Sequence, residues 1–218
     1  HITSETGVLL PVEEIVRRAR DAGLTTIVDG AHAPGHVPLD LEALGADFYS
    51  GNCHKWLCAP KGAGFLHVRP ERQARVEGPI VSWGHAEPTT FVTRTQEQGT
   101  RDAAAYLTVP AAIAFQQERA WEEVRARCVE LCRQARRDLC AVLDTEPIAP
   151  DEMVLQMASV RLPDGVGEAL GRTLWEEHRI EIPIMHPQNL LRISIAAYTT
   201  RDDVERLLDA LPRALART

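Results

Sequence analysis

The chain has 218 residues, which is enough to bury one substantial hydrophobic core or two small ones. Apolar residues make up 44% and charged residues 25%, and the net charge of −7, with the two signs interspersed, argues against nucleic acid as a partner. No apolar stretch approaches the roughly 20 residues of a membrane span, so no membrane partner is expected.

Helix and strand patterns alternate through the first 95 residues. A proline before residues 12–22 and a glycine after them are typical of the two ends of a helix. Residues 24–28 are rich in β-branched side chains, the pattern of a buried parallel strand. This alternation favours an α/β layer with its chemistry at the carboxyl ends of the strands. The patterns that follow predict a short helix at 39–44, a strand at 47–50, a turn at 60–64 and a strand at 64–68.

The pattern changes after about residue 95. Residues 102–143 are helical in pattern, with Pro110 either between two helices or at a kink. Thr200, with two acidic residues in the turn that follows it, predicts the N-cap of a last helix. We expect a small α+β domain with an antiparallel sheet here, and thus domains at 1–95 and 96–218. Its other elements are predicted as strands at 153–162, 180–185 and 191–196 and a helix at 166–179.

Functional side chains gather at the ends of two strand patterns. Asp29 and His32 follow the first strand, and Asn52, His54 and Lys55 follow the second. A lysine just past a strand end can lose part of its hydration, which favours the uncharged amine that forms imines. An acid, two imidazoles and a lysine are the groups that a pyridoxal phosphate site needs.

Each of these residues also has an ordinary structural interpretation. Lys55 could be a surface lysine, and Asp29 could be a turn or N-cap aspartate before Gly30. His32 and His54 could be structural hydrogen-bonding residues. A two-histidine metal site is a sharper alternative, but Lys55 would have no role in it.

The cysteines and the start of the chain bear on its compartment. The five cysteines form no CxxC pair, and we expect reduced thiols in a cytoplasmic protein. The first residues have neither the basic nor the apolar segment of a signal peptide. They also lack an initiator methionine, which suggests a fragment, a processed chain or a truncated sequence. These cysteines stand at positions 53, 58, 128, 132 and 140.

Two segments carry a family resemblance, at residues 28–35 (VDGAHAPG) and 51–66 (GNCHKWLCAPKGAGFL). They resemble the isopenicillin N epimerase-like proteins of the class V aminotransferase superfamily, and the resemblance extends from Ile2 to about Leu211. It implies a PLP-dependent (pyridoxal 5'-phosphate) transferase fold of type I. The chain would hold the C-terminal part of the large domain, followed by the small α+β C-terminal domain.

The resemblance also implies roles for the residues at the two strand ends. Lys55 is expected to form the Schiff base with the cofactor and to move the Cα proton of the substrate. Asp29 is expected to pair with the pyridinium nitrogen, and His32 stands where many relatives have a glutamine that contacts the phenolic oxygen. His54 would lie beside the phosphate, and Asn52 falls where relatives often place a phosphate-binding serine.

Three further positions are implied in the same way. Arg192 matches the arginine that holds the substrate α-carboxylate, although by itself it reads as an exposed strand arginine. Gly99 and Thr100 resemble the pair that reaches the phosphate bound by the neighbouring subunit, or Thr100 could simply cap a helix. If the pair has that role, the active sites of a dimer are shared. Apart from the resemblance, Trp83, His85 and Tyr198 are plausible pocket residues, although residues of these types more often serve in packing.

The resemblance further implies that family members are roughly twice as long. We expect a complementing N-terminal polypeptide that completes a heteromeric enzyme acting on an amino acid. A proteolytic fragment and an inactive remnant are alternatives. The expected reaction is epimerase-like or C–S lyase-like, with transamination and cysteine desulfurase chemistry as alternatives. A non-catalytic partner subunit, or an unrelated α/β binding module, would be a different class of function.

Overall fold

The computed structural model describes residues 1–218 and divides the chain into two compact units. The first unit consists of His1 and residues Pro11–Phe115, and the second of Ile2–Leu10 and Gln116–Thr218. The division thus falls later than the change of pattern near residue 95, and a short N-terminal segment belongs to the second unit. No helix in the chain combines the length and the apolar character needed to cross a membrane.

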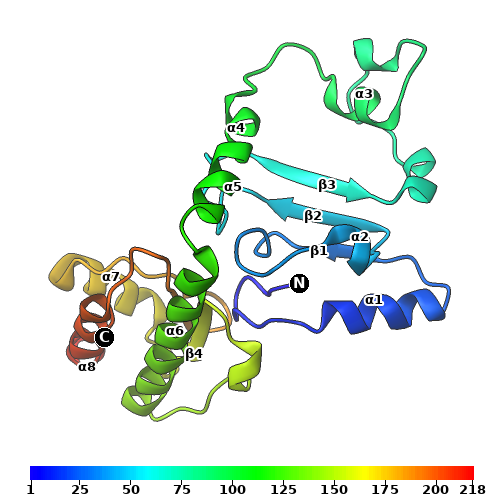
Figure 1. Ribbon diagram of the computed structural model, residues 1–218. Helices are drawn as coiled ribbons and strands as arrows, with labels where there is room; N and C mark the ends of the chain where they lie inside the picture. The colour runs from blue at the N-terminus through cyan, green and yellow to red at the C-terminus, as the bar shows by residue number, and fades with distance from the viewer. The chain divides into compact units, whose positions relative to one another are not determined.

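The first unit is built on a three-stranded sheet in the order β1-β2-β3 (Figure 1). Strand β1 (Ile27–Asp29) pairs in parallel with β2 (Phe48–Asn52), and β2 pairs antiparallel with β3 (Gly64–Val68). Helices α1 (Val12–Asp21) and α2 (Leu41–Leu44) precede β1 and β2 along the chain. Because β1 and β2 are parallel, their carboxyl ends lie side by side, and the loops that follow Asp29 and Asn52 leave the sheet at the same end.

The expectation of a buried strand at 24–28 was wrong for this chain. The strand begins only at Ile27, and Leu24 is 61% and Ile27 80% exposed. Strand β1 has a neighbour on one side only, so its outer edge and the apolar residues near it lack protein cover within this unit. An apolar run is typical of a strand that is packed against other elements, but it does not indicate which part of a protein packs against it.

Short helices complete the first unit. Pro110 is the second residue of α5 (Val109–Gln117), which follows α4 (Ala104–Leu107), so the alternative of two separate helices is confirmed. A small apolar cluster joins Cys53, Ala59 and Ala63 to α4 and α5. The remaining helices are η1 (Pro70–Arg75), η2 (Trp83–His85), α3 (Phe91–Gln96), α4 (Ala104–Leu107) and α5 (Val109–Gln117).

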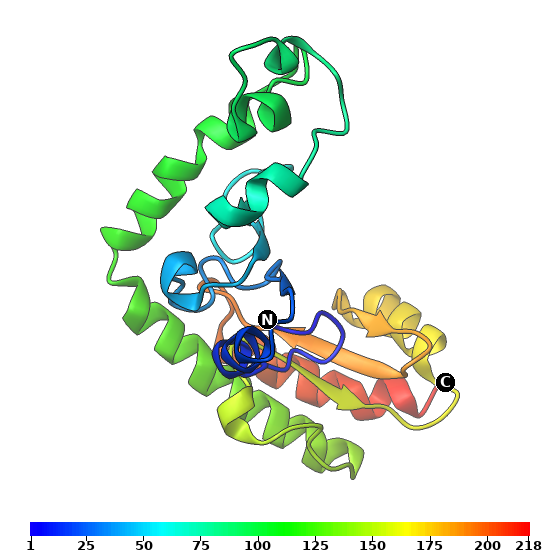
Figure 2. The same ribbon diagram turned by 90° about the vertical axis from the view of Figure 1, so that its right-hand side faces the viewer.

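The second unit is the expected α+β arrangement, with an antiparallel sheet in the order β4-β6-β5. Figure 2 shows its strands beside the long helix α6 and the C-terminal helix α8. The core is leucine-rich, and Leu139, Leu170, Leu174, Leu191 and Leu211 are fully buried. Its elements are α6 (Trp121–Leu143), η3 (Asp151–Met153), β4 (Met157–Arg161), α7 (Gly167–His178), β5 (Ile184–Met185), β6 (Leu190–Ser194) and α8 (Arg201–Leu215).

The start of α8 confirms the N-cap predicted from the sequence. The Thr200 hydroxyl accepts a hydrogen bond from the Asp203 backbone N–H, and the Asp203 carboxylate accepts one from the Thr200 N–H. The Thr200 N–H and the Thr200 hydroxyl both donate to the Asp203 carboxylate, and these two bonds lower its pKa. The strands at 153–162 and 180–185 are shorter than predicted. Helix η3 ends at Met153 and residues 154–156 lie outside any helix or strand before β4 begins, and irregular chain occupies the start of the second segment.

Candidate functional site

The loops after β1 and β2 bring His32, Lys55 and Trp56 into contact. His32 Nε2 lies 3.1 Å from Lys55 Nζ, and the Trp56 indole N–H donates to His32 Nδ1 at 3.3 Å. The His32 side chain is buried, and Lys55 is half-buried. The structure therefore joins the two strand-end motifs that the sequence singled out, which lie 23 residues apart.

Two glycines allow the loops to approach this closely. A Cβ on Gly30 would lie 2.1 Å from the ring of the fully buried Tyr49. Gly35 has φ +79°, and a Cβ there would lie 2.5 Å from the Trp56 carbonyl oxygen. Gly30 lets the chain lie close to Tyr49 of β2. Gly35 lets the turn after His32 contact the backbone of the loop that contains Lys55.

His36 is a site residue that sequence reasoning missed. Its Nδ1 lies 3.1 Å from the His32 carbonyl oxygen, and its ring stands 4.2 Å from the Trp56 ring, centroid to centroid. It is 3% exposed. The only signal in the sequence is its spacing of four residues after His32. That spacing becomes informative once the turn at Gly35 is known.

Asp29 and Asn52 are the last residues of β1 and β2, at the carboxyl ends of the strands as expected. One carboxylate oxygen of Asp29 accepts a hydrogen bond from the Ala31 N–H at 2.8 Å, as in an Asx-turn. Asp29 is exposed in this chain, because β1 is an uncovered edge strand. Its turn role leaves a second oxygen that can accept a hydrogen bond from a cation. Asn52 is half-buried and pairs with Gly64 of β3.

The ring of His54 is fixed by a backbone contact. Its Nδ1 lies 3.0 Å from the Ala63 carbonyl oxygen, which can only accept, so Nδ1 carries a proton. In the neutral ring Nε2 is then an acceptor, and it becomes a donor only in the imidazolium. His54 can therefore assist an anion such as a phosphate only in its protonated form.

Gly99 and Thr100 lie in the irregular chain between α3 and α4, and both are exposed. Gly99 has φ +94°. Thr100 does not cap α4. That helix starts at Ala104, and the Asp102 carboxylate accepts the hydrogen bond from its N–H. The capping alternative for Thr100 was therefore wrong, and its possible phosphate role stays a prediction.

Arg192 belongs to the second unit, where it faces Ser159 across the β4–β6 pair. Its Nη1 donates to the Ser4 carbonyl oxygen at 2.5 Å, and the Ser159 hydroxyl donates to the Glu5 carbonyl oxygen at 2.6 Å. The Nε of Arg192 is buried and has no hydrogen-bond partner. Burial lowers the pKa of this guanidinium.

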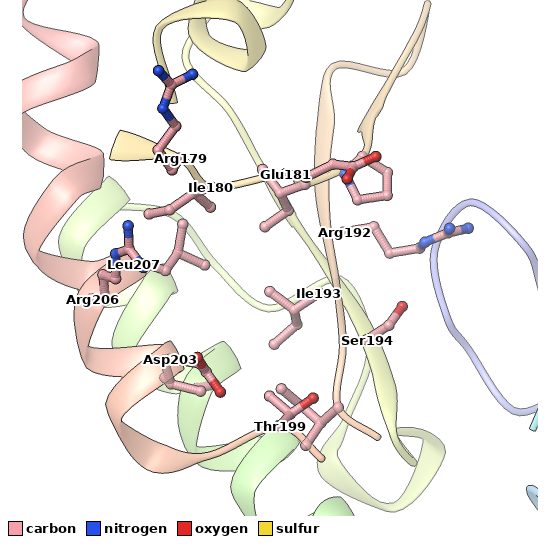
Figure 3. A pocket seen from close by; sticks show the side chains of 15 residues that line it. Arg179, Ile180, Glu181, Arg192, Ile193, Ser194, Thr199, Asp203, Arg206 and Leu207 are labelled. Carbon is pink, nitrogen blue, oxygen red and sulfur yellow. The ribbon is translucent and has the colours of Figure 1, made fainter. Parts of the chain in front are cut away.

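A cavity of about 360 Å³ lies in the second unit, between α8, β6 and residues 179–183. Figure 3 shows that Ile180, Ile193 and Leu207 line its interior, whereas the Arg192 guanidinium points away, toward the N-terminal loop. The cavity and the charged end of Arg192 are thus on different sides of the strand.

The weaker pocket candidates behave as surface or capping residues. Trp83 and Tyr198 are each 85% exposed. His85 Nδ1 accepts a hydrogen bond from the Ser82 N–H and so helps to start η2. None of the three belongs to the His32–Lys55 contact.

The thiols, the potential metal ligands and the lysines of the chain bear on which other kinds of site it could form. All five cysteines are free, and burial raises the pKa of every one, to about 12 for Cys132. No three histidine, cysteine, aspartate or glutamate side chains are grouped to hold a metal ion. The sequence contains only two lysines, Lys55 and the exposed Lys61.

Comparison with known families and sequences gives a consistent result. The profile "Aminotransferase class-V" matches residues 1–207. Isopenicillin N epimerase of Streptomyces clavuligerus is 42% identical over 97% of the chain, and that of Amycolatopsis lactamdurans is 38% identical over 97%. A putative L-cysteine desulfhydrase of Oryza sativa subsp. japonica is 30% identical over 99%. The chain spans 58%, 58% and 51% of the lengths of these relatives.

Solved structures share the fold. The apo cysteine desulfurase of Thermococcus onnurineus superposes on the whole chain with a TM-score of 0.86, at 21% identity and over 59% of its own length. A C-DES variant with glycine covalently linked to its PLP cofactor superposes on 97% of the chain with a TM-score of 0.78, at 24% identity and over 58% of its length. The fold is that of the type I PLP-dependent enzymes.

Proposed function

The chain belongs to the aminotransferase class V family, and we propose that it is the lysine-bearing C-terminal portion of a PLP-dependent enzyme that acts at Cα or Cβ of an amino acid. The first unit would complete the cofactor-binding domain, and the second would be the small C-terminal domain. One observation carries the proposal: the Lys55 amine lies within hydrogen-bond distance of the buried His32, at the edge where β1 and β2 both end.

The groups at this edge fit pyridoxal phosphate. The bound cofactor supplies an electron-withdrawing ring that acidifies the Cα–H bond of an attached amino acid. Lys55 provides the amine for its aldehyde and the base that moves the Cα proton. Asp29 offers a carboxylate to the pyridinium nitrogen, and His32 an imidazole to the phenolic oxygen. His54, as the imidazolium, and Asn52 suit the phosphate.

Arg192 is the proposed holder of the substrate carboxylate. A guanidinium binds a carboxylate through two parallel hydrogen bonds, which fixes orientation as well as affinity. The bond to the Ser4 carbonyl oxygen uses Nη1, and a buried Nε still needs an acceptor. Such an unsatisfied donor supports an anionic ligand at this arginine.

Among the possible reactions, we favour epimerisation, with C–S bond cleavage as the second candidate. The relatives at 42% and 38% identity are epimerases, whereas the matching desulfhydrases and desulfurases are 29–32% identical. The raised pKa of every thiol in the chain speaks against a cysteine of this chain as a desulfurase nucleophile, because the thiolate is the reactive form. No observation favours transamination.

We also propose that an N-terminal polypeptide segment completes the enzyme by covering β1. The apolar side chains that it would cover are exposed in the first unit, and the chain spans little more than half of its relatives. Exposed apolar strand edges are unfavourable in water. In a dimer of such completed enzymes, Gly99 and Thr100 would then reach the phosphate that is bound by the neighbouring subunit. The exposed apolar residues in and just before β1 are Leu24 (61%) and Ile27 (80%).

A reducing compartment suits this assignment. None of the five cysteines forms a disulfide in the structure. Four of them are buried and one is exposed. Free thiols are usual in the cytoplasm and unusual in secreted proteins. We therefore propose a cytoplasmic enzyme.

Trapping of the cofactor on the protein tests the function. Pyridoxal phosphate is added to the chain, borohydride fixes any bond to an amine, and peptide mass spectrometry locates the adduct. We expect the adduct on Lys55, its loss in Lys55→Ala and its persistence in the matched Lys61→Ala variant. Equal labelling of both lysines, or none after addition of a complementing N-terminal segment, would exclude the catalytic assignment and favour a non-catalytic partner subunit.

A further inference from the structure

The contact between Trp56 and His32 constrains the proton on the imidazole. An indole N–H can only donate, so His32 Nδ1, at 3.3 Å from Trp56 Nε1, must accept. A neutral imidazole carries one proton, which then stands on Nε2. His32 Nε2 faces Lys55 Nζ at 3.1 Å, so it donates to the lysine nitrogen.

The same hydrogen-bond assignment fixes the state of the lysine. A nitrogen that accepts a hydrogen bond must offer its lone pair, and an ammonium group has none. Lys55 can therefore accept from His32 only as the uncharged amine. An ammonium donating to Nε2 would leave both ring nitrogens without a proton, which a neutral imidazole does not allow.

The position of Trp56 is itself held by a second histidine. The His36 ring stands 4.2 Å from the Trp56 ring with an interplanar angle of 32°. His36 Nδ1 donates to the His32 carbonyl oxygen at 3.1 Å, so one residue braces the indole and the backbone of His32 together. His32 and His36 are 8% and 3% exposed, and this burial keeps water from replacing the contacts.

We propose that Trp56 is a positioning residue that selects the Nε2–H tautomer of His32 and thereby holds Lys55 as the uncharged amine that attacks a carbonyl carbon. The chemical use of this amine rests on the proposed function, but the tautomer does not. Trp56 need not touch the substrate or the cofactor, since it acts through His32.

Nitrogen-15 NMR of the histidine-labelled full chain, without cofactor, tests the tautomer directly. The His32 signals are assigned by their loss in His32→Gln. We expect the proton on Nε2 in the wild-type chain and a substantial Nδ1–H population in Trp56→Phe, which keeps the ring against His36 but lacks the donor. The exposed Trp83→Phe is the matched control and should leave the spectrum unchanged. A proton on Nδ1 in the wild-type chain overturns the proposal, whether or not any variant folds.

The reactivity of the lysine gives a second readout. At neutral pH an amine-reactive reagent labels the uncharged form, and Lys61 serves as the internal reference. We expect Trp56→Phe to slow labelling of Lys55 about fivefold, the ratio that one hydrogen bond of typical net strength gives. In the His32→Gln background, whose amide offers both a donor and an acceptor, the effect of Trp56→Phe should fall below about twofold. An equal effect in both backgrounds would mean a merely structural role and would overturn the proposal.

These two measurements need no bound cofactor. Failure of the borohydride trapping together with the expected spectra would reject the enzyme assignment and leave the tautomer selection intact. The reverse result, trapping on Lys55 with an Nδ1–H tautomer, would reject the role of Trp56 alone.

Discussion

Asp47 and Arg72 form an ion pair at 2.7 Å between Oδ1 and Nε, and the other carboxylate oxygen accepts bonds from the N–H and hydroxyl of Thr26. Asp47 stands just before β2 and Thr26 just before β1, so one carboxylate joins the starts of both strands to η1. Burial by itself raises the pKa of Asp47, but the bonds and charge of Arg72 and the bonds of Thr26 outweigh it and lower the pKa.

Asp47→Asn should therefore remove an acid-sensitive part of the stability. A depressed carboxyl pKa contributes stability that is complete above the unfolded-state pKa of about 3.9 and is lost as the pH falls through the lower folded-state value. We expect the variant to lose about 1–2 kcal/mol at neutral pH and to lose less than the wild type on acidification. Urea unfolding at neutral and acidic pH measures both. Parallel losses in the two proteins would contradict the linkage.

Gly30→Ala should destabilise the first unit by about 1–3 kcal/mol. Its new Cβ would meet the Tyr49 ring at 2.1 Å, and this ring is fully buried, so it cannot move without disturbing its neighbours. Gly171→Ala in α7 is the control, because its Cβ would meet only Ile184 at an ordinary 3.4 Å. Thermal or urea unfolding compares the two, and an unaffected Gly30→Ala would show that Tyr49 has space that the structure does not indicate.

Arg192→Gln should weaken binding of an amino acid to the completed, cofactor-loaded enzyme by about tenfold to a hundredfold, the value of a charge-assisted hydrogen-bonded pair. The change in cofactor absorbance on titration with the amino acid measures this. The corresponding amine without a carboxylate serves as control and should bind equally to both proteins. If its binding falls as much as that of the amino acid, Arg192 does not hold the carboxylate.

The five thiols should alkylate in an order set by exposure. Cys58 reaches the surface, whereas Cys132 is fully buried and its pKa is raised to about 12. We expect iodoacetamide to modify Cys58 first and Cys132 only on unfolding, as followed by peptide mass spectrometry. Early labelling of Cys132 would indicate that the core of the second unit opens readily.

The sequence predicted those parts of the fold that depend on local patterns. The N-cap at Thr200 and strand β3 at 64–68 follow from residues adjacent in the chain, and the structure has both. The pairing of His32 with Lys55 was also foreseeable, because parallel strands end at one edge. The roles proposed for Asp29, Asn52, His54, Gly99, Thr100 and Arg192 remain predictions.

Two features could not be foreseen, for different physical reasons. The exposure of Leu24 and Ile27 depends on what lies across the outer edge of β1, which no local pattern reports. The bracing of Trp56 by His36 depends on the close approach at Gly35, where the turn touches the lysine loop. A glycine in a sequence shows that such an approach is allowed, but it does not name the partner.

The scarcity of lysine has a consequence for how a reactive aldehyde would be handled. Of the 24 basic residues other than histidine, only Lys55 and Lys61 carry a primary amine on the side chain, and the rest are arginines. Under the proposed function, an aldehyde would thus meet one solvent-exposed lysine amine, at Lys61, and one at the strand-end site, at Lys55. An arginine carries the same positive charge as a lysine but has no primary amine, so it offers an aldehyde no site for imine formation. The selectivity expected of the proposed site would therefore depend in part on the composition of the whole surface.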